Sequence, residues 1–200
     1  MIIKRILDIG ISAGLLVLIS PILILASYLV FWDVGRPIFY RQVRSGKDGK
    51  PFTILKLRTM ANLIGSGPES SGASDEERVS KIGKLLRRSS VDELPQLWNV
   101  MRGEMSLVGP RPLLTEYLDL YSDEERRRLW VRPGVTGLAQ IQGRNAISWA
   151  EKFRWDLWYV DNWSLRLDIK ILALTIFIVA KGLGVNSSEG VTMEKFTGHK

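Results

Sequence analysis

The chain has 200 residues, a formal net charge of +7, no cysteine, and a single histidine, His199, next to the C-terminal residue. The lack of cysteine excludes disulfides, thiolate metal sites and thiol nucleophiles, and one histidine argues against a histidine-based triad or a multi-histidine zinc site. The positive excess suits an anionic membrane surface or phosphate-bearing substrates, and no helix-turn-helix, zinc-finger or RNA-binding signature accompanies it, so we expect no nucleic-acid partner.

An apolar segment opens the chain, from Ile9 to Trp32. At ~1.5 Å per residue it is long enough to cross a bilayer once as a helix. Pro21 lies near its middle and removes a backbone hydrogen bond, which favours a bend at Ser20-Pro21. The Ser20 hydroxyl could satisfy a carbonyl that the proline leaves free. From these residues alone, a spanning helix and a re-entrant helix that returns to the same face both remain open. We expect Asp8 to stay at the interface, near Lys4 or Arg5.

The next region predicts a β-hairpin, with strands over residues 38–43 and 51–57. Asp48-Gly49 between them favours a tight turn with positive φ. The hairpin brings together basic side chains that are either solvated or form a phosphate-facing strip: Arg41, Arg44, Lys56 and Arg58.

Residues 62–80 read as a surface loop, and residues 81–88 as a basic helix that leads to the adjacent carboxylates Asp92 and Glu93. Apolar residues then recur at helical spacing from Leu94 to Met101. With Asp92 as the N-cap, Pro95 falls within the first turn, where its missing N–H costs nothing. This pattern therefore predicts Asp92 at the positive end of a helix, which attracts phosphate oxygens.

Three rigid turns follow, around Arg111, at residues 132–137 and around Arg144. Several tryptophans then precede the apolar run 171–180, which is too short to span a bilayer. We interpret this run as an interfacial amphipathic helix, with a buried core helix as the alternative.

The chain resembles the small monotopic bacterial phosphoglycosyl transferases, which transfer a sugar-1-phosphate to a polyprenol phosphate. The similarity covers essentially the whole chain, and its motifs occur in order: Leu55–Met60, Val91–Asn99, Ser106–Pro112, Arg132–Gln140 and Gly143–Trp149. The ending Glu194–Gly198 resembles the branch that transfers diacetylbacillosamine phosphate.

The resemblance implies a two-step reaction. Asp92 would attack the sugar-linked phosphate of a UDP-sugar, UMP would leave, and undecaprenyl phosphate would then take the phosphosugar from the enzyme. Carboxylates can act as covalent nucleophiles, and Mg²⁺ would neutralise the diphosphate. Asp92 and Glu93 are the expected catalytic residues, and the expected metal ligands are Glu93, Asp92 and, more weakly, Asp168, for which an ion pair with Arg166 or Lys170 is the alternative. The expected substrate-binding residues are Arg58, Arg87, Arg111, Arg144 and Asn145.

The resemblance also favours the re-entrant helix. It implies a mostly helical α+β fold, with residues 1–35 as a re-entrant membrane helix broken at Ser20-Pro21. Residues 36–200 would form a cytosolic catalytic domain with a small hairpin and interfacial helices. The expected location is the cytosolic face of the bacterial inner membrane, in contact with membrane lipid and with downstream glycosyltransferases as further partners.

Two other functions compete with this one: a polyprenol-linked phosphatase, in which water attacks the same aspartyl phosphate, and a non-catalytic membrane adaptor. The donor sugar, the pathway and the oligomeric state do not follow from the sequence.

Overall fold

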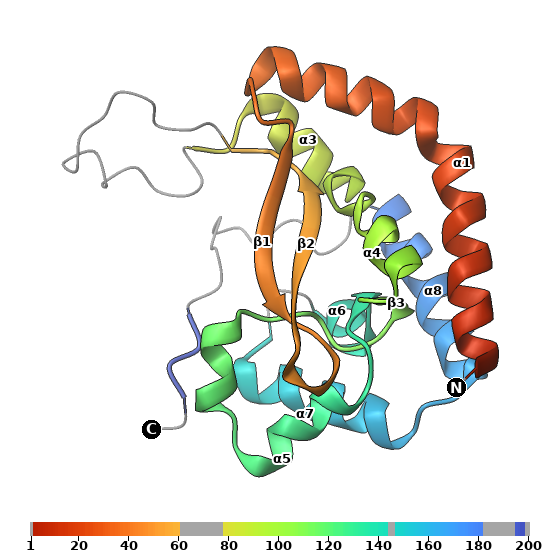
Figure 1. The fold of residues 1–200 in the computed structure, drawn as a ribbon, viewed down its shortest axis with the longest axis vertical. Coiled ribbons are helices and arrows are strands. Elements are labelled where there is room, and N and C mark those ends of the chain that lie inside the picture. Colours follow the sequence, from red (N-terminus) through yellow and green to blue (C-terminus); the bar gives the residue numbers. More distant parts are fainter. Residues whose placement is uncertain (1, 61–77, 144–146, 182–194, 199–200) are drawn as a thin grey trace.

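The computed structural model describes residues 2–60, 78–143, 147–181 and 195–198. The fold is α+β and mostly helical, as predicted (Figure 1). Its helices and strands, with η for short 3₁₀ turns, are α1 (Ile2–Asp33), β1 (Phe39–Ser45), η1 (Lys47–Gly49), β2 (Pro51–Leu57), α3 (Lys81–Arg88), η3 (Val91–Glu93), α4 (Gln96–Arg102), β3 (Ser106–Val108), η4 (Thr115–Leu120), α5 (Asp123–Arg126), η5 (Arg127–Trp130), β4 (Gly134–Thr136), α6 (Leu138–Gln142), α7 (Trp149–Asp161) and α8 (Leu165–Ala180).

Helix α1 is long enough and apolar enough to cross a membrane. It is one continuous helix with Pro21 inside it, rather than two separate helices. Figure 1 shows that it rises along one side of the molecule and then turns over the top. The Ser20 hydroxyl donates a 2.8 Å hydrogen bond to the Val17 carbonyl, which lies four residues before the proline. Since Pro21 has no N–H to offer that carbonyl, the serine replaces the missing donor, as the sequence suggested.

Both halves of α1 pack against the same globular body. Near its start, Asp8 accepts hydrogen bonds from the Ser106 hydroxyl (2.8 Å) and the Leu107 N–H (3.1 Å) of β3. Near its end, Ala26 and Val30 are buried in a cluster with residues of β2 and α3. Asp8 lies near Arg5, as expected, because its charge acts on the pKa of that arginine. Its hydrogen bonds, however, come from β3, which encloses the carboxylate and leaves the residue 5% exposed.

The predicted hairpin is confirmed. Strands β1 and β2 pair in antiparallel register from Phe39 opposite Leu57 to Ser45 opposite Pro51. The turn between them has positive φ at Asp48 (57°) and Gly49 (74°). A second, parallel pair joins β3 to β4. The main core lies between the hairpin, α4, the β3–β4 pair and the last two helices.

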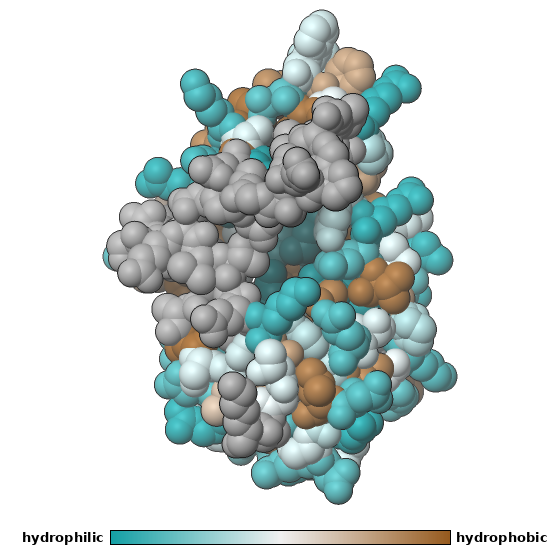
Figure 2. Space-filling model, turned by 90° about the vertical axis from the view of Figure 1, so that its left-hand side faces the viewer, coloured by the Kyte–Doolittle hydropathy of each residue, from teal (hydrophilic) through white to brown (hydrophobic). Residues whose placement is uncertain are grey.

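Apolar side chains remain exposed along α1 and α8. On α8, Ile171 is buried, whereas Ile169, Leu174, Ile176 and Phe177 are exposed. This pattern disagrees with a buried core helix and agrees with a helix that lies against a lipid surface. On the side of the molecule away from α1, the described residues that are visible are mostly hydrophilic, and they surround a hollow near the middle of the view (Figure 2).

Candidate active site

The adjacent carboxylates lie in the short turn η3, directly before α4. Ser90 leads into this turn with a φ of 56°, a left-handed conformation that few residues other than glycine adopt. The expected N-cap role of Asp92 is wrong: Asp92 is inside the 3₁₀ turn, and α4 begins after Pro95. Pro95 fits the position before the helix because no N–H is required there. The backbone therefore turns sharply before α4, and both carboxylates lie in this turn, ahead of the helix.

Two cations hold Glu93. The Lys56 Nζ lies 2.6 Å and the Arg111 Nη2 lies 3.0 Å from its Oε1 atom. Burial alone would raise the pKa of Glu93, but Arg111 and Lys56 outweigh it and keep that pKa well below its usual range. Glu93 is therefore ionised at neutral pH.

Asp92 has the opposite environment. The residue is 8% exposed, and its carboxylate accepts no hydrogen bond or ion pair from any described residue. Burial, and next the charge of Glu93, raise the pKa of Asp92 to about 6, against the weaker opposing effect of Lys56, Arg87 and Arg111. Near neutral pH Asp92 is thus a desolvated carboxylate, to which no cation of the described segments is bonded, and this is the form that a nucleophile needs.

Lys56 was expected only as part of a basic strip on the hairpin, and the sequence did not predict its contact with Glu93. It continues the inward face of β2 after Phe52 and Ile54, both of which are buried. A lysine at the third inward position of an alternating strand was the available signal. Asn99 ties α4 to the strand that carries Lys56, because its side chain accepts from the Leu55 N–H (3.1 Å) and donates to the Thr53 carbonyl (2.7 Å).

The structure separates the predicted substrate-binding residues. Arg111 reaches Glu93, and Arg87 is exposed on α3, where its charge acts on Asp92. Arg58 is 7% exposed, and its guanidinium donates to the carbonyls of Val34 and Arg36, after α1. The structure thus gives Arg58 a structural role at the end of α1. Arg144 and Asn145 lie outside the described residues.

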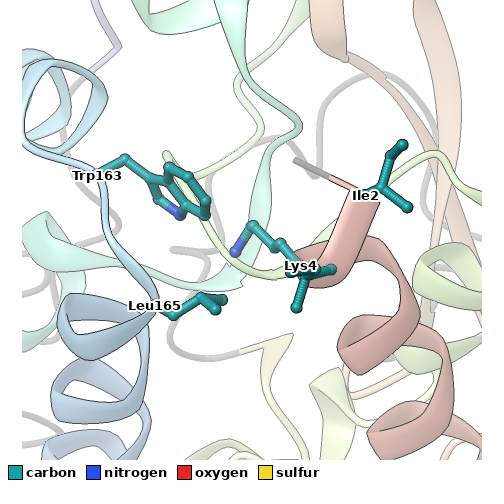
Figure 3. Close-up of a pocket in the computed structure, with 5 residues that line it drawn as sticks. Ile2, Lys4, Trp163 and Leu165 are labelled. Carbon is teal, nitrogen blue, oxygen red and sulfur yellow. The ribbon is translucent and has the colours of Figure 1, made fainter.

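Asp168 belongs to a different part of the molecule. It forms a 2.6 Å ion pair with Lys4 of α1, rather than with Arg166 or Lys170. It also accepts hydrogen bonds from the Tyr159 hydroxyl (2.7 Å) and the Trp163 indole (3.1 Å). Figure 3 shows the Lys4 amine and the Trp163 indole directed toward one another beside a cavity of about 300 Å³. The structure does not bring Asp168 together with Asp92 and Glu93.

Within the described part of the chain, no cluster of three or more acidic or histidine side chains could hold a metal ion. Asp92 and Glu93 nevertheless fit one mode of Mg²⁺ binding, in which one or two carboxylates act together with substrate phosphates and water. The Asp92 carboxylate has no bonded partner among the described residues, and the Lys56 and Arg111 cations both contact one oxygen of Glu93, Oε1. Oxygen ligands of this kind suit a hard cation.

Comparison with known proteins places this geometry in context. The model of a family described as bacterial sugar transferase matches residues 1–182. An uncharacterized sugar transferase, EpsL of Bacillus subtilis, is 50% identical over 99% of this chain and 97% of its own length. The UDP-glucose:undecaprenyl-phosphate glucose-1-phosphate transferase of Caulobacter vibrioides is 44% identical over 86% of this chain and 68% of its own length. The undecaprenyl-phosphate galactose phosphotransferase of Salmonella typhimurium is 37% identical over 89% of this chain, which spans 40% of that protein.

Proposed function

Because the chain belongs to the bacterial sugar transferase family, we propose that it transfers a sugar-1-phosphate from a UDP-sugar to undecaprenyl phosphate and releases UMP. The observation that carries the proposal is the asymmetry of the two carboxylates. Glu93 is neutralised by Lys56 and Arg111, whereas Asp92 is buried and has no bonded partner in the described segments. The names of the relatives from Caulobacter and Salmonella support the same reaction.

In the first proposed step, an Asp92 oxygen bonds to the sugar-linked phosphorus, the bond from that phosphorus to UMP breaks, and UMP leaves with the electron pair. In the second step, a phosphate oxygen of undecaprenyl phosphate attacks the same phosphorus. The bond to Asp92 then breaks, which restores the free carboxylate and yields undecaprenyl diphosphate sugar. No water is consumed, which distinguishes this reaction from that of a phosphatase.

The surrounding residues have defined tasks in this scheme. Arg111 has a planar fork that matches two phosphate oxygens, and its side chain is 48% exposed, so a substrate can reach it. Arg87 offers a second exposed cation near Asp92. Asp92 and Glu93 would hold Mg²⁺, which supplies charge neutralisation at the diphosphate when bound. Lys56 and Arg111 keep Glu93 ionised and oriented.

We further propose that the reaction takes place at a lipid surface on the cytosolic side of the inner membrane. Lys4 and Asp8 near the start of α1, and Val30 near its end, all contact the same globular body. A helix that crossed the bilayer would carry one of these ends away from the body. A bent α1 that enters and leaves on one face keeps both contacts, and it exposes its apolar side chains to lipid. The product would begin glycoconjugate assembly, with downstream glycosyltransferases as further partners.

For the donor, we propose a UDP-N-acetylated amino sugar such as UDP-diacetylbacillosamine, because the ending Glu194–Gly198 is similar to that branch. Glu194 lies outside the described residues, whereas Phe196 is buried against Tyr117, Tyr121 and Phe153. A UDP-hexose is the second candidate, which the glucose and galactose in the relatives' names favour.

The deciding experiment is a UMP-release screen over a panel of UDP-sugars with undecaprenyl phosphate. Mass spectrometry after UDP-sugar alone should find a phosphosugar on the peptide that contains Asp92. Asp92→Asn should lower turnover by on the order of 10³-fold, about 4 kcal/mol of barrier, whereas a loss below tenfold would contradict the nucleophile assignment. Chelation should stop the reaction and Mg²⁺ should restore it. UMP release without lipid at a steady rate would indicate a phosphatase, and no UMP release from any donor would indicate an adaptor.

A further inference from the structure

The loop that carries Arg111 is held through its carbonyl groups. Arg111 stands between Pro110 and Pro112, and proline has no N–H, so the loop has few donors of its own. Four consecutive carbonyls instead accept hydrogen bonds from other segments. The donors are Gly134 N for Pro110 (2.9 Å), Arg128 Nη2 for Arg111 (2.8 Å), Arg44 Nη1 for Pro112 (3.5 Å), and Ser45 N and Oγ for Leu113 (2.9 and 3.1 Å).

Arg128, which holds the Arg111 carbonyl, is itself fixed from several sides. Its side chain is 3% exposed, and its Nη2 and Nε atoms lie 2.7 and 3.1 Å from an oxygen of Asp156 on α7. Its Nη1 donates to the Tyr121 hydroxyl at 3.3 Å. The rings of Tyr121 and Phe153 each lie 5.7 Å from the guanidinium carbon. The guanidinium therefore has little freedom to move.

A buried ion pair of this kind is weak evidence of a stabilising role, because the cost of removing both charges from water can equal or exceed their attraction. Apolar residues of similar volume often replace such pairs with no loss of stability. The pair does, however, hold the Arg128 Nη2 donor in a fixed direction. That donor binds the backbone carbonyl of Arg111, whose side chain contacts Glu93. We propose that Arg128, held by Asp156, is a positioning residue that sets Arg111 against Glu93 and the phosphate groups of the nucleotide substrate. This inference rests on the proposed function.

The test compares two ion pairs that join the same elements, η5 and α7. Arg128→Met with Asp156→Leu removes the buried pair. Arg127→Met with Asp161→Leu removes the neighbouring ion pair between Arg127 and Asp161, whose side chains are more exposed. Each variant of the full chain, in detergent with Mg²⁺, is titrated with UDP by calorimetry, and its thermal unfolding is recorded. Arg111→Met alone, and Arg111→Met combined with the buried-pair variant, complete a thermodynamic cycle.

We expect the buried-pair variant to bind UDP about tenfold more weakly while it unfolds within a few degrees of the parent, and the Arg127–Asp161 variant to bind like the parent. Since Arg128 acts through Arg111, its loss should weaken UDP binding no further once Arg111 is replaced by methionine. Parent-like binding by the buried-pair variant, or fully additive losses, would overturn the inference. If the double replacement does not fold, UDP binding by Arg128→Lys is measured instead, with the same expected loss. A single lysine ammonium cannot reproduce the forked hydrogen bonds of the Arg128 guanidinium. A parent that binds no UDP would instead contradict the proposed function.

Discussion

Lys56 and Glu93 meet at 2.6 Å, across the boundary between the hairpin and the turn that precedes α4. Both side chains are mostly buried, with 19% and 22% of their surface exposed. The contact joins a strand position that faces the core to one of the two carboxylates of the site, so the hairpin contributes to the chemistry as well as to the fold.

Replacement of Lys56 by Met should therefore impair the reaction without unfolding the hairpin. With one of its two cations lost, Glu93 presents more uncompensated charge to Asp92, which raises the pKa of Asp92 further. We expect kcat/KM at pH 7 to fall at least tenfold, with the acid limb of its pH profile displaced to higher pH. Lys50→Met, at an exposed position in the same hairpin, is the control. An unchanged profile for Lys56→Met would contradict this role.

The rate should fall below about pH 6 in the parent. Burial and Glu93 raise the pKa of Asp92 to about 6, and only the ionised carboxylate can attack phosphorus. As the pH falls below that value, each further unit should lower the UMP-release rate about tenfold, because the ionised fraction falls by that factor. The measurement is the initial rate between pH 4.5 and 8 at a fixed Mg²⁺ concentration well below saturation, because a cation bound at Asp92 would itself lower the pKa of that carboxylate. A flat profile down to pH 4.5 would show that Asp92 titrates in its ordinary range.

Asp92→Asn should make the protein more stable at neutral pH. Folding raises the pKa of Asp92 from 3.8 to about 6, so the folded state favours the protonated carboxyl group. The free energy of unfolding therefore decreases as the pH rises from 3.8 toward 6. Above pH 6 the ionised carboxylate costs about 2–3 kcal/mol, which an uncharged amide avoids. The unfolding temperature of Asp92→Asn should exceed that of the parent at pH 7.5, and the difference should vanish near pH 4. Equal unfolding temperatures at pH 7.5 would argue against the burial cost.

The path of α1 can be tested with single cysteines, because the chain has none of its own. Ile3→Cys places a thiol at the start of α1, and Lys47→Cys places one in the hairpin turn. If both ends of α1 lie on the cytosolic side, a membrane-impermeant thiol reagent should label neither protein in intact bacteria. Labelling of the Ile3→Cys protein would mean a spanning helix.

A straightened α1 provides the positive control for this labelling. Ser20→Leu with Pro21→Leu restores the continuous backbone hydrogen bonding of a straight helix. Because Lys4 and Asp8 would still bind the globular body, we expect labelling of the N-terminal cysteine only when both are also changed to Leu. The cysteine in the hairpin turn should stay protected in every variant.

Local patterns in the sequence predicted those features that depend on neighbouring residues. The hairpin, its positive-φ turn and the role of the Ser20 hydroxyl all follow from residues within a few positions of one another. The prediction of Asp92 as an N-cap failed because Ser90 adopts a left-handed conformation that redirects the chain before α4.

Partners that lie far apart in the sequence could not be predicted in this way. Lys56 and Arg58 are two residues apart, so an extended strand would place them on the same face. Strand β2 ends at Leu57, however, and the Arg58 side chain turns toward the end of α1. Asp168 was expected either as a weak metal ligand or as the partner of Arg166 or Lys170, yet it forms its ion pair with Lys4. Helical periodicity contains no information about a residue from the opposite end of the chain.

The Lys4–Asp168 pair also constrains how the protein is made. The two residues are 164 positions apart, and the donors that enclose Asp8 are about a hundred positions away, in β3. While the ribosome is still producing the middle of the chain, the charges at the start of α1 have not yet met these partners, and burial of either charge in lipid would be costly. The first helix to emerge from the ribosome is therefore among the last to form its tertiary contacts. We expect its final seating in the bilayer to follow the synthesis of α8, so that insertion and folding end as one event.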